Sequence, residues 1–237
     1  MYNNSDQSGH FSFRLFTTVL KFYKKKEVIT IYQIFYSLDR EKQERIINAA
    51  LKEFAQNGYE KASTNVIIKE AEIAKGSLFK YFNSKKELYL FLFDYVNGVI
   101  NKIYDEVDWN ETDLFERMKQ IGLIKLRIYK QYPKAFDFLK SVPNENSPEV
   151  KSKIDAIEKE LIENGLGLGY KNINLSKFRD DMDTKKIMNI ITWTIMSFSE
   201  QQIKKVSSFE NVDIELFYEW DEYFDILKRC FYKKEEQ

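Results

Sequence analysis

The chain has 237 residues, of which 31% are charged and 43% hydrophobic, a composition typical of globular proteins with one large or two small domains. Lysine plus arginine and aspartate plus glutamate number 37 each, so a contact with nucleic acid must come from a local patch. A single cysteine excludes an internal disulfide and weakly favours a reducing compartment. The single histidine, His10, leaves no raw material for a His/Cys metal site or a His-based triad. We therefore expect no metal, no cofactor and no catalytic residues, and no apolar run is long enough for a membrane span.

Glycine and proline are scarce, with 8 and 3 residues, and this scarcity predicts long helices and an all-α fold. Residues 1–36 are the hardest part to interpret. We expect a weakly helical or poorly ordered N-terminal extension; the alternative is a basic arm, through residues 24–26, that touches a DNA backbone.

The first strong helix is expected from Asp39 to Asn57, with Asp39 as its cap. Gly58 then ends the helix in a left-handed conformation. A second helix begins at Ser63 or Thr64 and turns its apolar residues Val66, Ile67 and Ala71 inward. A third helix follows a turn at residues 72–73 and is anchored by Leu78 and Phe82.

Ser84 and Glu87 have the spacing of a capping box and open a fourth helix, whose apolar positions continue for about five turns. Further helices are expected over residues 114–132, 135–140, 149–164, 185–203 and 214–232. We interpret residues 165–169 as an interhelical loop, because the glycines lack the strand and spacing of a phosphate loop. These boundaries predict an extension at 1–36, a helix-turn-helix domain at 37–83 and a helical domain at 84–237.

The segment from Lys61 to Lys86 carries six lysines against two acids, an excess of four positive charges in a neutral chain. The lysines lie at positions 61, 69, 75, 80, 85 and 86. A short cationic helix held by an apolar frame is suited to the major groove of DNA. Such a helix pair can also be a plain structural corner with solvated lysines, and the ordered set of caps, turn and aromatic residues favours DNA binding.

Residues 39–95 resemble the DNA-binding domain of the TetR family of bacterial transcriptional regulators. The resemblance is carried by the first helix, the run Ala71-Glu-Ile-Ala-Lys-Gly-Ser-Leu-Phe-Lys-Tyr-Phe82, and Ser84-Lys-Lys-Glu-Leu88. It is specific over about a quarter of the chain. Beyond it, only the length and the helical pattern agree with the family.

The resemblance implies a set of DNA contacts. Lys75 suits a phosphate, Gly76 lets the backbone approach DNA, and Tyr81 supplies a ring near the groove edge. The full set of implied DNA-binding residues is Ser63, Thr64, Asn65, Lys75, Gly76, Ser77, Phe79, Lys80, Tyr81 and Lys85.

Three positions depart from the family pattern. Glu72 stands where relatives usually have the turn glycine, and Ala74 where a capping serine is common, a loss worth about 1 kcal/mol. Phe79 replaces a frequent tyrosine, so a hydroxyl contact with phosphate is missing. Because of these departures, the sequence does not predict which DNA bases the third helix prefers.

The resemblance further implies that the larger domain is a helical bundle that forms a dimer interface and a ligand pocket. Two helices are apolar on more than one side, Lys185–Ile203 and Ile214–Tyr232. They are expected to pair with the same helices of a second copy. The alternative is that both helices fill the core of the monomer. The expected ligand is hydrophobic or aromatic. The candidate pocket residues are Met118, Ile121, Tyr129, Phe136, Phe138, Trp193 and Met196. Residues of this kind are more often ordinary core than ligand contacts.

The resulting hypothesis is a cytoplasmic, ligand-responsive regulator, most often a repressor in this family, that binds a palindromic operator as a dimer. The alternative is a DNA-associated interaction protein with the same fold and no small-molecule control. An enzyme is the weakest reading, because Asp180, Asp181 and Asp183 lie in a polar stretch without an assembled base or nucleophile.

Overall fold

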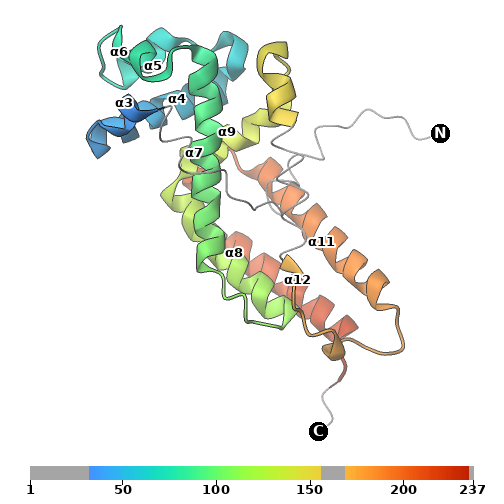
Figure 1. Ribbon diagram of the computed structural model, residues 1–237. Helices are drawn as coiled ribbons and strands as arrows, with labels where there is room; N and C mark the ends of the chain where they lie inside the picture. Colours follow the sequence, from blue (N-terminus) through green and yellow to red (C-terminus); the bar gives the residue numbers. More distant parts are fainter. Residues whose placement is uncertain (1–31, 156–168, 235–237) are drawn as a thin grey trace, which may run out of the picture.

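The computed structural model of the chain describes residues 32–155 and 169–234, and helices dominate these ranges (Figure 1). The only β-bridge within them joins Phe178 to Tyr232. The predicted all-α class is therefore confirmed. The helices are α3 (Gln33–Tyr36), α4 (Arg40–Lys61), α5 (Thr64–Glu70), α6 (Ser77–Phe82), α7 (Lys85–Glu106), α8 (Leu114–Gln131), α9 (Pro133–Ser141), α11 (Thr184–Lys205) and α12 (Glu215–Phe231).

The expected extension up to residue 31, most of the helix expected at 149–164, and residues 165–168 of the expected loop lie outside the described residues. None of the helices in the described ranges has the length and hydropathy needed to cross a bilayer.

Helix α4 begins where the sequence indicates, but it continues to Lys61, past the end expected at Gly58. The Asp39 carboxylate accepts the Lys42 N–H at 2.8 Å and caps its first turn. Near the other end, Gly58 has φ +65°, where a side chain would be strained. The buried stripe of α4 includes Ile46 and Phe54.

Helix α7 links the two ends of the molecule, from the region of α5 and α6 to that of α8 (Figure 1). The Ser84 hydroxyl accepts the Glu87 N–H at 3.1 Å, which is one half of the predicted capping box. The other half is replaced, because Glu87 instead accepts from the Asn83 side chain at 2.9 Å.

The N-terminal core extends further than the sequence indicated. Tyr32 and Phe35 are buried although both fall in the predicted extension. The Phe35 ring packs 5.0 Å from Phe82 and 5.1 Å from Phe91. Helix α3 therefore closes the core on which α6 sits. Spacing alone missed it, because α3 has only four residues.

Helix α9 lies against α4 and connects the body to the N-terminal helices. Just after α9, the buried Glu145 carboxylate accepts the Tyr59 N–H at 2.5 Å and the Ser147 N–H at 2.8 Å. The carboxylate therefore ties the end of α4 to the loop that follows α9.

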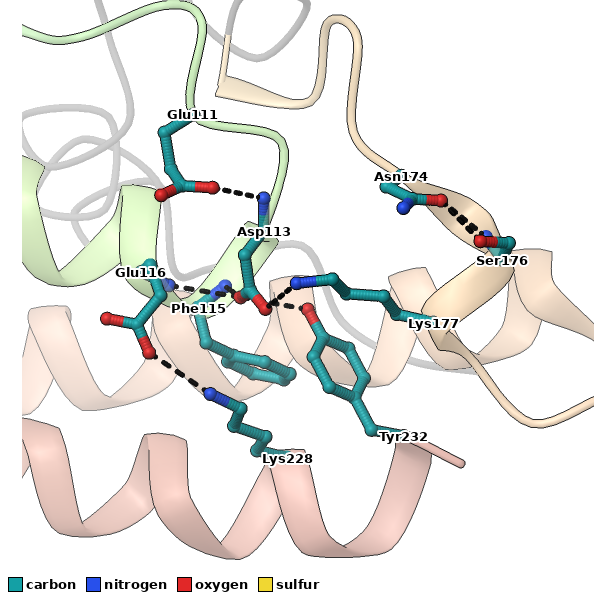
Figure 2. A network of polar contacts seen from close by, with 9 residues as sticks. All are labelled: Glu111, Asp113, Phe115, Glu116, Asn174, Ser176, Lys177, Lys228 and Tyr232. Carbon is teal, nitrogen blue, oxygen red and sulfur yellow. Dashed lines mark hydrogen bonds and ion pairs between the residues drawn. The ribbon is translucent and has the colours of Figure 1, made fainter. Parts of the chain in front are cut away.

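Figure 2 shows a polar network at the far end of the body. The buried Asp113 carboxylate caps α8 through the N–H groups of Phe115 and Glu116, and it also accepts from Lys177 at 2.8 Å and Tyr232 at 3.0 Å. Burial alone would raise the pKa of Asp113, but these hydrogen bonds outweigh it and lower the pKa. The network fastens the end of the chain to the start of α8.

Candidate DNA-binding site and ligand cavity

The turn between α5 and α6 is built around Glu72, which has φ +54°. This is the left-handed region that favours glycine, so Glu72 accepts the strain that its place in the motif requires. The Ile73 N–H donates to the Ile68 carbonyl at 3.1 Å, and the Arg45 side chain donates to the Ala71 carbonyl at 3.4 Å. These bonds hold the turn despite the missing glycine.

Helix α6 separates its anchors from its polar face. Leu78 and Phe82 are buried as predicted, each 1% exposed. Lys75 and Lys80 are exposed, and Ser77 is half-buried. Phe79 keeps 44% of its surface exposed, so a large apolar ring lies beside the lysines. The charged and aromatic side chains on this surface are free to meet a partner.

Gly76 precedes α6 with φ −79°, a conformation open to any residue. A Cβ added there would meet no heavy atom within 4 Å. Neither the backbone conformation nor the internal packing requires glycine at this position.

Two of the implied contact residues are turned inward or occupied. Tyr81 is buried, with its ring 6.5 Å from that of Phe35, so the expectation of a ring at the groove edge is wrong. The Lys85 ammonium donates to the carbonyls of Glu60 and Ala62, each at 3.0 Å. It closes the end of α4 where the sequence suggested a DNA contact.

The start of α5 also differs from expectation. No side-chain hydrogen bond caps the helix at Ser63; instead the Ser63 N–H donates to the Glu53 carboxylate at 2.8 Å. Thr64 is half-buried and Asn65 is exposed. Val66, expected inside, is 44% exposed, because Ile67 and Ile68 fill the inner face.

The surface around α5 and α6 remains cationic. Lys61 and Lys69 are exposed together with Lys75 and Lys80. One of the two acids in this stretch, Glu70, is paired with Lys52 at 2.7 Å. The predicted local excess of positive charge is therefore presented to solvent, where it can attract phosphate.

The body contains a cavity of about 110 Å³ between α7, α8, α11 and α12. Its walls are largely aromatic and aliphatic. The described lining residues are Tyr104, Trp109, Met118, Gly122, Lys125, Leu126, Tyr129, Gly169, Tyr170, Ile195, Phe198, Leu216, Phe217 and Trp220.

Two of the seven sequence candidates, Met118 and Tyr129, are among these lining residues. The other five are not: Ile121, Phe136, Phe138, Trp193 and Met196. Phe138 packs instead against Tyr89 in the core that joins body and N-terminal domain, at 5.4 Å between ring centroids. Trp193 is 62% exposed. Aromatic character alone did not separate cavity, core and surface.

Two of the lining residues that the sequence missed, Gly122 and Lys125, lie in one stripe with the two that it found. Met118, Gly122, Lys125 and Tyr129 recur on α8 at spacings of four, three and four, which places them on one face of a helix. The lysine in this stripe hid it from a search for apolar positions.

Lys125 is 8% exposed, and burial lowers its pKa to about 7. Burial likewise raises the pKa of Tyr104 and Tyr129, which line the same cavity. These phenols therefore stay neutral at physiological pH, while the lysine titrates there.

A second buried cation braces the cavity wall. The Arg117 guanidinium donates to the carbonyls of Trp109, Glu111, Gly169 and Lys171. Two of these residues, Trp109 and Gly169, also line the cavity. Arg117 therefore holds two chain segments together at its edge.

The acids considered for an enzyme reading have structural partners. Asp181 pairs with Arg179 at 2.6 Å, Asp180 pairs with Lys233 at 2.9 Å, and Asp183 caps α11.

Comparison with known proteins adds family relationships to this geometry. A sequence model for the family described as "Bacterial regulatory proteins, tetR family" matches residues 46–91. The Staphylococcus aureus protein IcaR, the HTH-type negative transcriptional regulator of the biofilm operon icaADBC, is 26% identical over 168 residues, covering 67% of this chain and 86% of IcaR. The Bacillus subtilis HTH-type transcriptional regulator YuxN is 46% identical over 56 residues, covering 24% of this chain and 19% of YuxN.

Solved structures share the fold. A TetR family transcriptional regulator from Chloroflexus aurantiacus J-10-fl has a TM-score of 0.56 at 22% identity, covering 85% of this chain and 98% of that one. The ketosteroid transcriptional regulator KstR2 of Mycobacterium tuberculosis has a TM-score of 0.53 at 17% identity, covering 84% and 98%. The likeness extends over the body as well as the N-terminal helices.

Proposed function

We propose that this chain is a TetR family transcriptional regulator. It is a cytoplasmic repressor that binds a palindromic operator as a dimer and is released by a small-molecule effector. The relative IcaR is a negative regulator, which supports repression over activation. The observation that carries the proposal is the exposed cationic face of α6 above a fully buried apolar anchor.

The environment of Gly76 is a specific reason to propose DNA contact at the start of α6. Its conformation and its open surroundings leave the fold indifferent to a side chain there. A requirement for glycine would then come from outside the chain, from a phosphate backbone close to the start of α6.

This idea is testable with Gly76→Ala, compared with Gly98→Ala, whose added Cβ would also meet nothing within 4 Å. We expect both variants to change the free energy of unfolding by less than about 1 kcal/mol. Only Gly76→Ala should weaken binding to the DNA upstream of the chain's own gene. Equal DNA affinity in both variants would contradict a close approach of the DNA backbone to Gly76.

The proposed dimer uses the outer faces of α11 and α12. Ile190 and Trp193 on α11 are 41% and 62% exposed, and Tyr218 and Ile226 on α12 are 59% and 48% exposed. Several exposed apolar side chains of this size favour a protein interface over solvent. A two-fold pair would present two α6 helices to half-sites one or more DNA turns apart, about 34 Å per turn.

Sedimentation of Trp193→Asp tests this interface. A buried charge at a paired surface should shift the protein toward monomer and lower its operator affinity, whereas Leu123→Asp, at a 43% exposed position on α8, should leave the dimer intact. A dimer that survives Trp193→Asp, Tyr218→Asp and their combination would exclude this face.

The alternative function is a DNA-associated interaction protein without small-molecule control. Mapping the protein's binding sites across the genome distinguishes it from a repressor. A repressor should occupy a few promoter sites and leave them when its effector is present. Broad occupancy unrelated to promoters would favour the alternative.

A further inference from the structure

Phe79 leaves a large apolar ring on the surface of α6. The other apolar residues of this helix, Leu78, Tyr81 and Phe82, are buried, whereas Phe79 is 44% exposed. Its neighbour Lys80 is also exposed. An aromatic ring gains free energy by leaving water, and the inner face of α6 is already filled by the three buried residues. A partner that contacts α6 from outside can therefore bury this ring.

The position of Phe79 places its ring near the proposed DNA contact. Phe79 is the third residue of α6 and lies three positions after Gly76. The Lys80 N–H donates to the Gly76 carbonyl at 3.3 Å, so one helical turn includes both Gly76 and Phe79. Residues three apart on a helix are neighbours on its surface. A helix that meets DNA at Gly76 therefore turns Phe79 toward the same groove, where the first residues of a recognition helix contact base edges.

We propose that Phe79 recognises a thymine in each operator half-site by packing its ring against the C5-methyl group of that base. The inference rests on the proposed DNA binding and deepens it by naming one base that the protein prefers. The expected preference is for thymine over cytosine, the pyrimidine that lacks this methyl group.

The chemistry of the ring limits what it can read. A phenyl group has no hydroxyl or amide, so Phe79 cannot distinguish bases by the donors and acceptors on their edges. In the major groove, the C5-methyl group is the apolar feature that separates thymine from the other three bases. Burying one such group is worth about fourfold in affinity. The deoxyribose sugars also offer apolar surface, but contact with them would not depend on the base.

The lysines around Phe79 have a different task. Lys75 and Lys80 are exposed on this surface, as are Lys61 and Lys69. Ammonium groups attract phosphates whatever the base sequence, so they position α6 on the duplex without selecting a base. Phe79 adds a contact that depends on the base. The affinity should therefore fall with salt, while the preference for thymine depends on a methyl group.

Removal of single methyl groups from DNA tests the proposal. Duplexes enriched from random-sequence DNA by the full-length protein serve as the probe. Each thymine in one half-site is then replaced by deoxyuridine, which pairs like thymine and lacks only the C5-methyl group. We expect one replacement to weaken binding of the parent protein by about fourfold at fixed salt. Phe79→Ala should bind the thymine and deoxyuridine duplexes equally, as a direct contact requires in a double-mutant cycle.

Two further variants sharpen the test. Phe79→Leu keeps a shorter apolar side chain and should retain a smaller methyl effect. Leu123→Ala, at a 43% exposed position on α8, should retain the full effect. The same methyl effect in Phe79→Ala as in the parent would overturn the proposal. A parent protein that is indifferent to every thymine methyl group would overturn it as well, and weaker binding of Phe79→Ala would then point to a sugar contact.

The same experiment separates this inference from the proposed function. A selection that enriches no DNA sequence would reject DNA-sequence recognition by the chain, and the reading of thymine with it. An enriched operator whose thymine methyl groups do not matter would keep the proposed function and reject only the role of Phe79.

Discussion

The two ends of the molecule place their charges in opposite ways. At the DNA-binding end, aromatic rings fill the interior and lysines such as Lys75 and Lys80 lie outside. In the body, Arg117, Lys125 and Asp113 are buried. Arg117 donates to backbone carbonyls, and Asp113 accepts from Lys177 and Tyr232. The first arrangement suits an extended anionic partner, and the second holds helices and loops of the body together. Changes to the core, to the link between the ends, and to the buried lysine test this contrast.

The largest effect is expected from Phe35→Ala. The Phe35 side chain is fully buried against Phe82 and Phe91, so its loss should lower the free energy of unfolding by about 3–5 kcal/mol in urea denaturation. Ile34→Ala, at a 47% exposed neighbour, is the matched control and should cost well under this amount. A loss below about 1 kcal/mol for Phe35→Ala would mean that α3 is not part of the DNA-binding core.

Glu145→Ala should have the next largest effect. It leaves the buried N–H groups of Tyr59 and Ser147 without their acceptor and should cost about 2 kcal/mol. The exposed neighbour change Asn146→Ala should cost less than about 0.5 kcal/mol.

If Glu145 transmits ligand occupancy from the body to α4, Glu145→Ala should also weaken effector-induced release of DNA. An unchanged free energy of unfolding would show that the Glu145 hydrogen bonds do not hold α4 to the loop after α9. Reduced stability with unchanged release of DNA would show that Glu145 stabilises the fold without transmitting ligand occupancy.

A smaller, pH-dependent effect is expected from Lys125. Its folded-state pKa of about 7 lies below the ordinary lysine value, so the unfolded chain binds more protons between these values. Stability relative to Lys125→Met should therefore rise as the pH increases from 7.5 to 9.5, by about 1 kcal/mol per pH unit. Thermal denaturation of both proteins at matched pH checks this slope. A flat or falling difference would contradict the buried, neutral lysine.

The contrast between the ends also explains what the sequence could predict. At the DNA-binding end, helical spacing identified the inner residues Leu78 and Phe82 and the outer residue Lys80, because charge and burial there follow one pattern. Tyr81 and Lys85 were expected to contact DNA, and the structure places both in contacts within the protein. Each side chain has an apolar part and a polar end, so tertiary contacts decide whether it faces the core or the solvent.

In the body, the same pattern gave the helices and missed most of the cavity. Phe136 and Phe138 resemble pocket residues in composition, but they fill the contact between α9 and its neighbours. Lys125 resembles a surface residue, but it lies inside. The cavity wall also depends on segments far apart in the chain that Arg117 brings together, and spacing within one helix carries no information about them.

The most direct test of the DNA-binding account is the salt dependence of operator affinity for Lys75→Ala and Lys80→Ala. The control is Lys185→Ala, at an exposed lysine of α11. Helix α11 lies apart from α6 (Figure 1). Each lysine that contacts a phosphate should, when removed, weaken binding and reduce the slope of log affinity against log salt by about 1, while the control keeps the parent slope. Parent affinity and slope in both lysine variants would show that neither α6 nor the turn before it contacts DNA.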